Sequence, residues 1–356
     1  MDDSFESEGS VPQNHYHYHY HYYTPQRHAG RRAKAGRLGG EKPLTDKGRI
    51  RRNANIVCGG LLLLVIISFA AYWIAGVLAR IVVSANQFVE LRHIIEQAVS
   101  IVANTLSFGL ALLMIKKWLR IPARFAFPMQ LKDFSITLPA IFICLGINTF
   151  GGFLHGIIAA MLETGFGVVS SGPELIAPDG GPALLMYIIS LTIIPAVLEE
   201  LVFRGVVMQS LRRFGDGFAL VVSAILFGLI HGNLIQFIPA FLAGIAIGYF
   251  VMRTGSILTG ILIHLANNAI VIATDLLTRG GSEELMMITG SVINVFNLST
   301  GVIAVAFLLW RRPGIFRLAP SPIPPAKGKK GLYFFTSLTC IIFTLLSLGI
   351  MATFFY

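Results

Sequence analysis

The chain has 356 residues, of which 54% are hydrophobic and only 13% are charged, and its mean hydropathy is +0.71. Soluble domains carry about 25% charged residues, so this composition excludes a soluble globular protein and predicts a polytopic membrane protein. The net charge of +10 is not read as a nucleic-acid footprint, because the basic residues lie at the ends of apolar segments. We therefore expect the lipid bilayer as a partner and no nucleic acid.

The first 53 residues form a polar segment that alternates His and Tyr and then becomes basic. We predict that 1–53 is a disordered, basic cytoplasmic tail. Its first ten residues are acidic and lack an apolar region, so no secretory signal peptide is expected. Two other roles stay open, namely adhesion of the basic run to anionic lipid and weak metal chelation by the tail histidines. Those histidines are His15, His17, His19 and His21.

Apolar segments of about 20 residues, the length that crosses a bilayer, follow the tail. They lie near 56–78, 96–115, 134–161, 182–203, 217–231, 235–252, 256–277, 286–310 and 332–354. The fold class predicted from them is an all-α, polytopic transmembrane helix bundle of about eight to nine helices. Its expected parts are the bundle at 54–310, a Pro- and Lys-rich cytoplasmic linker at 311–331 and an additional C-terminal transmembrane helix at 332–356.

The distribution of basic residues predicts the orientation of the chain. With the N-terminus in the cytoplasm, all but three of the 28 Lys and Arg residues fall on the cytoplasmic side, the exceptions being Arg80, Arg92 and Arg279. Such an asymmetry is typical of the positive-inside rule. We expect an integral protein of a bacterial cell membrane with a cytoplasmic N-terminus.

Adjacent carboxylates in an apolar segment point to a functional site. Glu199 and Glu200 are followed by Arg204, and intramembrane acids are functional-site candidates by default. Residues four apart share a helix face, whereas adjacent residues diverge by about 100°. The spacing predicts a Glu200–Arg204 pair and leaves Glu199 free to face a cavity as a base. The alternative is that all three merely join an ion network between helices.

Two further apolar segments each contain a histidine with a partner one turn away. Phe227 precedes His231, and His264 precedes Asn268, by four residues. The histidines at 93 and 155 and the cysteines at 58, 144 and 340 show no metal or disulfide spacing and are interpreted as structural. Three apolar segments thus supply a carboxylate, two imidazoles and an amide, the inventory of a hydrolytic site inside a membrane.

The helical rise predicts which of these groups can meet. Glu199 lies 14 residues before the turn expected at 213–217 and His231 lies 14 residues after it, so both are about 21 Å from the turn. His264 is eight residues after Ser256, or about 12 Å. The register of His264 therefore differs by about 9 Å, unless its helix begins deeper in the bundle.

The three motifs in order, Glu-Glu-x-x-x-Arg at 199–204, Phe-x-x-x-His at 227–231 and His-x-x-x-Asn at 264–268, resemble the signature of the CAAX prenyl endopeptidase and bacteriocin-processing family, also called the Abi or CPBP family. The resemblance covers about 180–275, which would be the catalytic core. It implies an α-helical intramembrane endopeptidase that hydrolyses peptide bonds of membrane-associated, prenylated or other peptide substrates.

The resemblance also implies roles for individual residues. Glu199 would act as the general base on water with help from His231, while His264 and Asn268 would stabilise the oxyanion. Family members are often described as metal-dependent. Zinc or another divalent metal held by Glu199, His231 and His264 is therefore an open possibility. Glu200, Arg204 and Phe227 would support the site.

Two other functions remain as alternatives. The first is a non-catalytic, immunity-type membrane protein that binds a peptide or an enzyme. The second is a proton-coupled transporter, in which buried Glu and His are also expected. Transporters often contain inverted repeats, and the sequence shows none.

Overall fold

The computed structural model describes residues 45–83, 89–131, 133–173, 176–317 and 329–356. Six helices have lengths of 21 residues or more: α1 (Asp46–Val83), α2 (Val89–Leu119), α4 (Phe134–Phe166), α9 (Leu234–Thr254), α10 (Ile257–Thr278) and α11 (Glu283–Arg311). A further long helical run is divided into α5 (Gly181–Leu191), α6 (Ile193–Glu200), the π-helix η1 (Leu201–Met208), α7 (Gln209–Leu211) and the 3₁₀ turn η2 (Arg212–Phe214). Shorter helices are α3 (Ala123–Ala126), α8 (Asp216–Leu229), α12 (Lys330–Phe335) and α13 (Leu338–Ala352).

These helices confirm the predicted all-α membrane bundle. Among the described residues, seven helical stretches are long and apolar enough to cross a membrane. The other two expected spans correspond to α8 and α13, which have only 14 and 15 residues and fall short of the about 20 residues that a crossing needs. Large apolar side chains such as Phe69, Trp73 and Leu113 are exposed on the outside of the bundle, as expected for a surface that contacts lipid.

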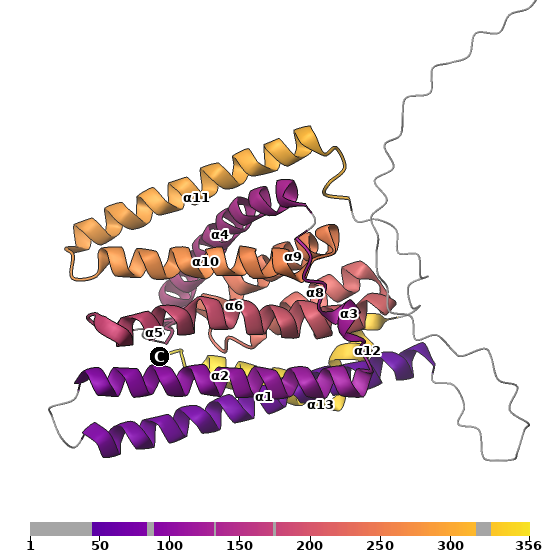
Figure 1. The fold of residues 1–356 in the computed structure, drawn as a ribbon, viewed down its shortest axis with the longest axis horizontal. Coiled ribbons are helices and arrows are strands. Elements are labelled where there is room, and N and C mark those ends of the chain that lie inside the picture. The colour runs from indigo at the N-terminus through magenta and orange to yellow at the C-terminus, as the bar shows by residue number, and fades with distance from the viewer. Residues whose placement is uncertain (1–44, 84–88, 132, 174–175, 318–328) are drawn as a thin grey trace, which may run out of the picture.

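The helices run roughly along one axis, and α4 crosses the others obliquely (Figure 1). The first two helices, α1 and α2, lie side by side along one edge, and α11 lies at the opposite edge against α4. The helices that carry the predicted site, α6, α8 and α10, lie between these edges. The site is therefore enclosed by the bundle.

The N-terminal boundary differs from the predicted one. The tail was expected to extend to residue 53, but α1 begins at Asp46, because the basic residues at 47–52 continue the helix beyond the apolar stretch. Residues 1–44, which include the His-Tyr repeat, lie outside the described residues, as does 318–328 of the predicted linker.

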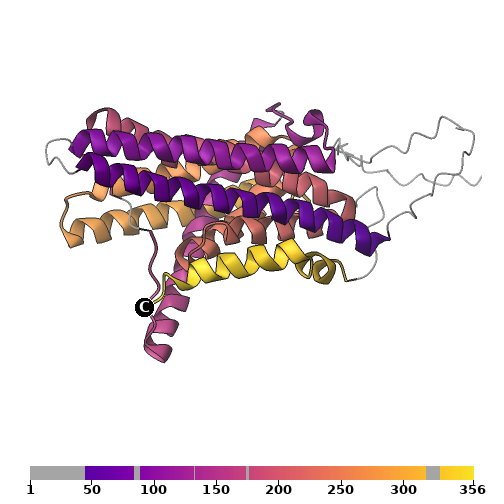
Figure 2. The same ribbon diagram turned by 90° about the horizontal axis from the view of Figure 1, so that it is seen from below.

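The C-terminal helix is closely attached to the bundle. Helix α13 packs along α1 (Figure 2), and the Thr339 hydroxyl donates to the Asn55 backbone oxygen over 3.1 Å. After α13, the chain forms an isolated antiparallel bridge between Phe355 and Ser170. A Cβ on Gly232, next to His231, would lie 2.9 Å from Ile350. The helix that was expected only as an addition to the bundle therefore contacts the turn that carries His231.

Candidate functional site

A break in the helical run places the two glutamates. Helix α5 ends at Leu191 and α6 begins at Ile193, because Pro195 lacks the N–H that would bond to Leu191 and its ring clashes with that carbonyl. The π-helix η1 follows directly after Glu200. Such segments are rare and occur frequently at functional sites. The glutamates thus lie between two irregularities of one membrane-spanning segment.

The predicted Glu200–Arg204 pair is confirmed. Arg204 Nη1 donates to Glu200 Oε1 over 2.7 Å, and the two side chains are 1% and 0% exposed. Arg204 Nη2 also donates to the Gly244 carbonyl oxygen of α9 over 3.3 Å. The guanidinium lies over the Phe227 ring, 4.3 Å from its centroid, a favourable cation–π arrangement. The charge of Arg204 is therefore compensated on three sides.

Glu200 also bonds His264, a contact that the sequence analysis did not predict. His264 Nδ1 lies 3.1 Å from Glu200 Oε1, and because the carboxylate is the acceptor of the Arg204 bond, it also accepts the Nδ1 proton of the imidazole. The close approach of α10 depends on Gly260, since a Cβ there would lie 2.7 Å from Glu200 Oε2. Glu200 therefore orients His264 as well as pairing with Arg204.

Glu199 differs from its neighbour in having no hydrogen-bonded cation among the described residues, whereas Glu200 bonds Arg204 through Oε1 and leaves only its own Oε2 unpartnered. The Oε2 atom of Glu199 is buried and has no hydrogen-bond partner among the described residues. The nearest basic atom is His264 Nε2 at 3.9 Å, within ion-pair range and too long for a hydrogen bond. Its side chain is 13% exposed. Glu199 is thus a nearly buried carboxylate with acceptor capacity to spare.

The expected mismatch of about 9 Å in the depth of His264 does not occur, because α10 begins deeper than its sequence position suggested. The backbone N–H of Ile257 donates to the Pro128 carbonyl oxygen over 2.9 Å. The chain at Pro128 therefore lies beneath the first turn of α10. The Thr137 and Thr259 hydroxyls, 3.0 Å apart, join α4 to the same turn of α10. Together these contacts set His264 level with Glu199.

His231 lies in a turn rather than inside a helix. Helix α8 ends at Leu229, and Gly232 adopts a positive φ of +64°, which reverses the chain. His231 Nδ1 lies 2.8 Å from the Phe227 carbonyl oxygen, and a carbonyl can only accept, so Nδ1 carries the proton. In neutral His231, Nε2 is therefore an acceptor, which suits a group that binds or orients water.

Asn233, which was not among the predicted site residues, fixes the turn of His231. Its Nδ2 donates to the His231 carbonyl oxygen over 2.9 Å, while its Oδ1 accepts from the Gln236 backbone N–H and caps α9. Asn233 is 1% exposed. An Asn followed by Gln three residues later is a recognisable helix-start pattern, so the signal was present in the sequence.

Phe227 lies at the centre of the site. Its ring packs edge-on against His231 and His264, with centroids 5.1 and 5.8 Å away, in addition to Arg204 on its face. We refer to Glu199, Glu200, Arg204, Phe227, His231 and His264 as the Phe227 cluster. The structure thus gathers the predicted residues of three segments around one aromatic ring.

Asn268 lies one turn beyond His264 on α10 and is half-buried. Its Oδ1 accepts from Asn267 Nδ2 over 3.4 Å, which leaves the Asn268 N–H₂ group as a donor. The expected assistance of Glu199 by His231 has no direct contact in the structure. The imidazole that lies near Glu199 is that of His264.

The residues do not form a three-ligand metal site. Within the described ranges, no three His, Cys, Asp or Glu side chains come close enough to hold one ion. Nδ1 of each imidazole is occupied, by Phe227 in one case and by Glu200 in the other. Dependence on a divalent metal stays a prediction.

The comparison with protein families matches this part of the chain. Residues 181–270 match the family model described as type II CAAX prenyl endopeptidase Rce1-like. That range contains every residue of the Phe227 cluster and Asn268. No curated protein and no solved structure matches the chain. Over residues 181–270, this membrane protein has a domain of the Rce1-like family of type II CAAX prenyl endopeptidases.

Proposed function

We propose that this protein is an intramembrane endopeptidase in which Glu199 activates water for attack on a peptide bond of a membrane-associated substrate. The observation that carries the proposal is the contrast between the two glutamates. Glu200 is ion-paired with Arg204, whereas Glu199 Oε2 is buried and unpartnered at 3.9 Å from His264. A carboxylate with a free lone pair in a largely water-excluded site is suited to general base catalysis.

In the proposed reaction, Glu199 carries one proton from the attacking water to the leaving nitrogen. The carboxylate takes a proton from water as the oxygen attacks the carbonyl carbon, which forms a tetrahedral oxyanion. The C–N bond then breaks, and protonated Glu199 returns the proton to the leaving nitrogen. The enzyme regains its starting form, and no residue becomes covalently attached to the substrate.

The other side chains have roles that follow from their free atoms. His231 presents Nε2 as an acceptor and would orient the attacking water. The Asn268 N–H₂ group has no acceptor among the described residues, and protonated His264 would offer Nε2–H while Glu200 holds Nδ1. Donors aimed at a developing oxyanion contribute about 3–4 kcal/mol in known hydrolases. Arg204 and Phe227 would position the acid and the imidazoles.

The substrate and the cellular setting are part of the proposal. The Rce1-like domain supports peptide-bond hydrolysis at the level of the family. We propose membrane-associated peptides or proteins as substrates, prenylated or not. We also propose a bacterial cell membrane, with the N-terminus in the cytoplasm because the basic residues concentrate on that side.

The test is cleavage of a library of membrane peptides by the full-length protein in lipid nanodiscs. We expect cleavage by the wild type and loss of cleavage in Glu199→Gln. The matched control is Glu163→Gln, the same change at an exposed acid near the end of α4, which should cleave like the wild type and excludes a copurifying protease. Equal cleavage by Glu199→Gln and the wild type would refute the role of Glu199.

The same preparations separate this function from the alternatives. An immunity-type protein would bind a peptide without cleaving it in any variant. A proton-coupled transporter would move protons in proteoliposomes without releasing peptide fragments. The metal prediction is checked by measuring the zinc content of the wild type and of Glu199→Ala, because loss of a ligand would lower that content independently of activity.

A further inference from the structure

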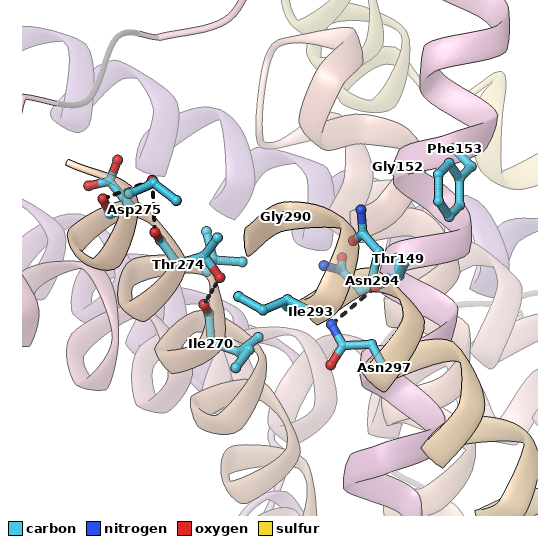
Figure 3. A pocket seen from close by; sticks show the side chains of 13 residues that line it. Thr149, Gly152, Phe153, Ile270, Thr274, Asp275, Gly290, Ile293, Asn294 and Asn297 are labelled. Carbon is cyan, nitrogen blue, oxygen red and sulfur yellow. Dashed lines mark hydrogen bonds between the residues drawn. The ribbon is translucent and has the colours of Figure 1, made fainter. Parts of the chain in front are cut away.

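A cavity of about 610 Å³ lies between α4, α10 and α11, beyond the Phe227 cluster along α10. Figure 3 shows the contributions of the three helices, with Ile270 and Thr274 from α10, Asn294 and Asn297 from α11, and Thr149 from α4. We call this cavity the α4–α10–α11 groove. None of the proposed catalytic residues lines it.

The packing of small residues explains why the groove opens where it does. A Cβ on Gly146 of α4 would lie 3.0 Å from the Asn297 carbonyl oxygen and 3.4 Å from Gly301 of α11. These glycines let the two helix backbones touch, as small residues do in membrane proteins. Beyond this crossing the helices separate, and the residues that follow Gly146 on α4 line the opening.

The groove is unusually rich in amides for the space between membrane helices. Asn148, Asn294 and Asn297 all line it. Asn297 is 5% exposed and donates through Nδ2 to the Thr149 hydroxyl over 3.2 Å, yet its Oδ1 atom is buried without a partner. The Asn148 and Asn294 side chains are half-buried and have no hydrogen-bond partner among the described residues. Because unpaired polar groups are costly in a membrane interior, these amides require a ligand or water.

The lining also defines the chemistry of a suitable ligand. Asp275 is the single charged residue among those that line the groove, and it is exposed. Ile270, Ile293 and Phe153 supply apolar surface beside the amides. Primary amides both donate and accept, as a peptide backbone does, and apolar surface suits uncharged side chains. The lining thus matches an extended peptide segment with uncharged residues.

The groove is continuous with the catalytic face of α10. His264, Asn268, Val271 and Asp275 recur every three or four residues, so they share one side of the helix. Val271 lies seven residues beyond His264, or about 10 Å, and Thr278 about 21 Å. An extended peptide rises about 3.4 Å per residue. A substrate bound at His264 would reach the groove about three residues from the cleaved bond and leave it about six residues away.

We propose that the α4–α10–α11 groove binds the substrate peptide on one side of the scissile bond, through amide contacts to the backbone of the third to sixth residues. The inference rests on the proposed endopeptidase function and identifies where the substrate binds and how long it must be. Asn294 and Asn148 are the binding residues, while Asn297 holds α11 against α4.

The test uses peptides that the full-length protein cleaves, lengthened one residue at a time on each side of the cleaved bond. In the wild type, adding the third to sixth residues on one side should lower KM by about tenfold, the effect of one or two amide hydrogen bonds, with little change in kcat. In Asn294→Leu, adding the same residues should lower KM by less than about threefold. Ser291→Leu, a polar-to-apolar change at an exposed position of α11 outside the groove, should retain the wild-type decrease in KM.

Asn148→Leu provides a second variant on another helix and should reproduce the loss if Asn294→Leu fails to fold. The inference is overturned if KM does not depend on length, or if the wild type and both folded Asn variants respond equally. A farnesylated version of each peptide tests whether the groove binds a lipid chain instead of the peptide backbone. If Asn294→Leu binds the farnesylated peptide more tightly than the wild type does, the groove holds a lipid chain.

A binding measurement separates this inference from the proposed function. The dissociation constants of the same peptides are measured with wild-type protein and with Glu199→Gln. If Glu199→Gln still cleaves, the proposed base is wrong. The length dependence of binding, and its loss in Asn294→Leu, still decide the role of the groove.

Discussion

The Phe227 cluster and the α4–α10–α11 groove both place polar side chains between membrane helices, but they satisfy them differently. In the cluster, the Arg204 charge is matched by Glu200, by a carbonyl oxygen and by the Phe227 ring. In the groove, the half-buried Asn148 and Asn294 amides have no hydrogen-bond partner within the part of the chain that the structure describes, and Asn297 bonds through Nδ2 but not through Oδ1. Glu199 belongs to the cluster, but its buried Oε2 atom has no hydrogen-bond partner among the described residues, like the Oδ1 atom of Asn297 in the groove. The unpaired atoms of Glu199 and of the groove amides lie at the two places where we propose that the protein acts and binds, whereas the Arg204 charge is compensated and stabilises the fold.

The largest expected effect concerns the unpaired acid. We expect Glu199→Gln to lower kcat by about 10²–10⁴-fold, the usual contribution of a positioned general base, while the thermal midpoint in detergent stays near that of the wild type. The measurement is single-turnover cleavage beside a thermal unfolding scan. Unchanged kcat would mean that the unpaired carboxylate is not the base.

The paired acid should show the opposite behaviour. Glu200→Gln and Arg204→Gln each leave an uncompensated buried charge or donor, and breaking such a pair costs about 3–5 kcal/mol of unfolding free energy. Thermal unfolding of the two variants is compared with that of Glu199→Gln. Equal midpoints for all three would contradict the distinction between the two glutamates.

Gly260 tests how closely α10 must approach Glu200. An added Cβ would lie 2.7 Å from both Glu200 Oε2 and Val251 Cγ2, so we expect Gly260→Ala to destabilise the fold by about 1–3 kcal/mol. Gly109 of α2 has open space where a Cβ would be, and Gly109→Ala should be neutral or stabilising by up to about 1 kcal/mol. Similar midpoints for the two variants would show that the close contact does not matter.

Substitution of Asn233 tests whether this residue, which caps α9, also holds the turn that carries His231. Asn233→Ala should cost about 1 kcal/mol as a lost N-cap and should also lower kcat, because the His231 backbone loses its support. Ser282 caps α11 through the Leu285 N–H, and Ser282→Ala is the matched control, with a similar loss of stability but wild-type kcat. A wild-type kcat in Asn233→Ala would remove Asn233 from the positioning of His231.

The smallest effect is expected from the N-terminal tail. Deletion of His15–Tyr23, with the basic residues up to Arg52 retained to keep the topology, should leave turnover of a short peptide nearly unchanged. The deleted residues lie outside all three motifs. If both cleavage and metal content disappeared while the topology stayed intact, the tail histidines would belong to the site.

The hydrophobicity and the motif spacing were sufficient for several conclusions. The apolar segments predicted an all-helical membrane bundle, and the four-residue interval between Glu200 and Arg204 predicted their ion pair, because local helical geometry alone brings such residues together. Whether α8 and α13 cross a membrane could not be judged from apolarity alone, because turns and caps shorten both helices.

Only the tertiary structure decided which imidazole lies near which acid. His264 lies next to Glu199 and Glu200 because α10 begins against Pro128, a contact between segments more than 100 residues apart that the helical rise along α10 cannot encode. The groove likewise depends on Gly146 and Gly301 meeting across two helices. Periodicity along one helix determines which side chains share a face of that helix. The partners of those side chains on other helices depend on how the helices pack and how deeply each one begins, which are properties of the assembled fold.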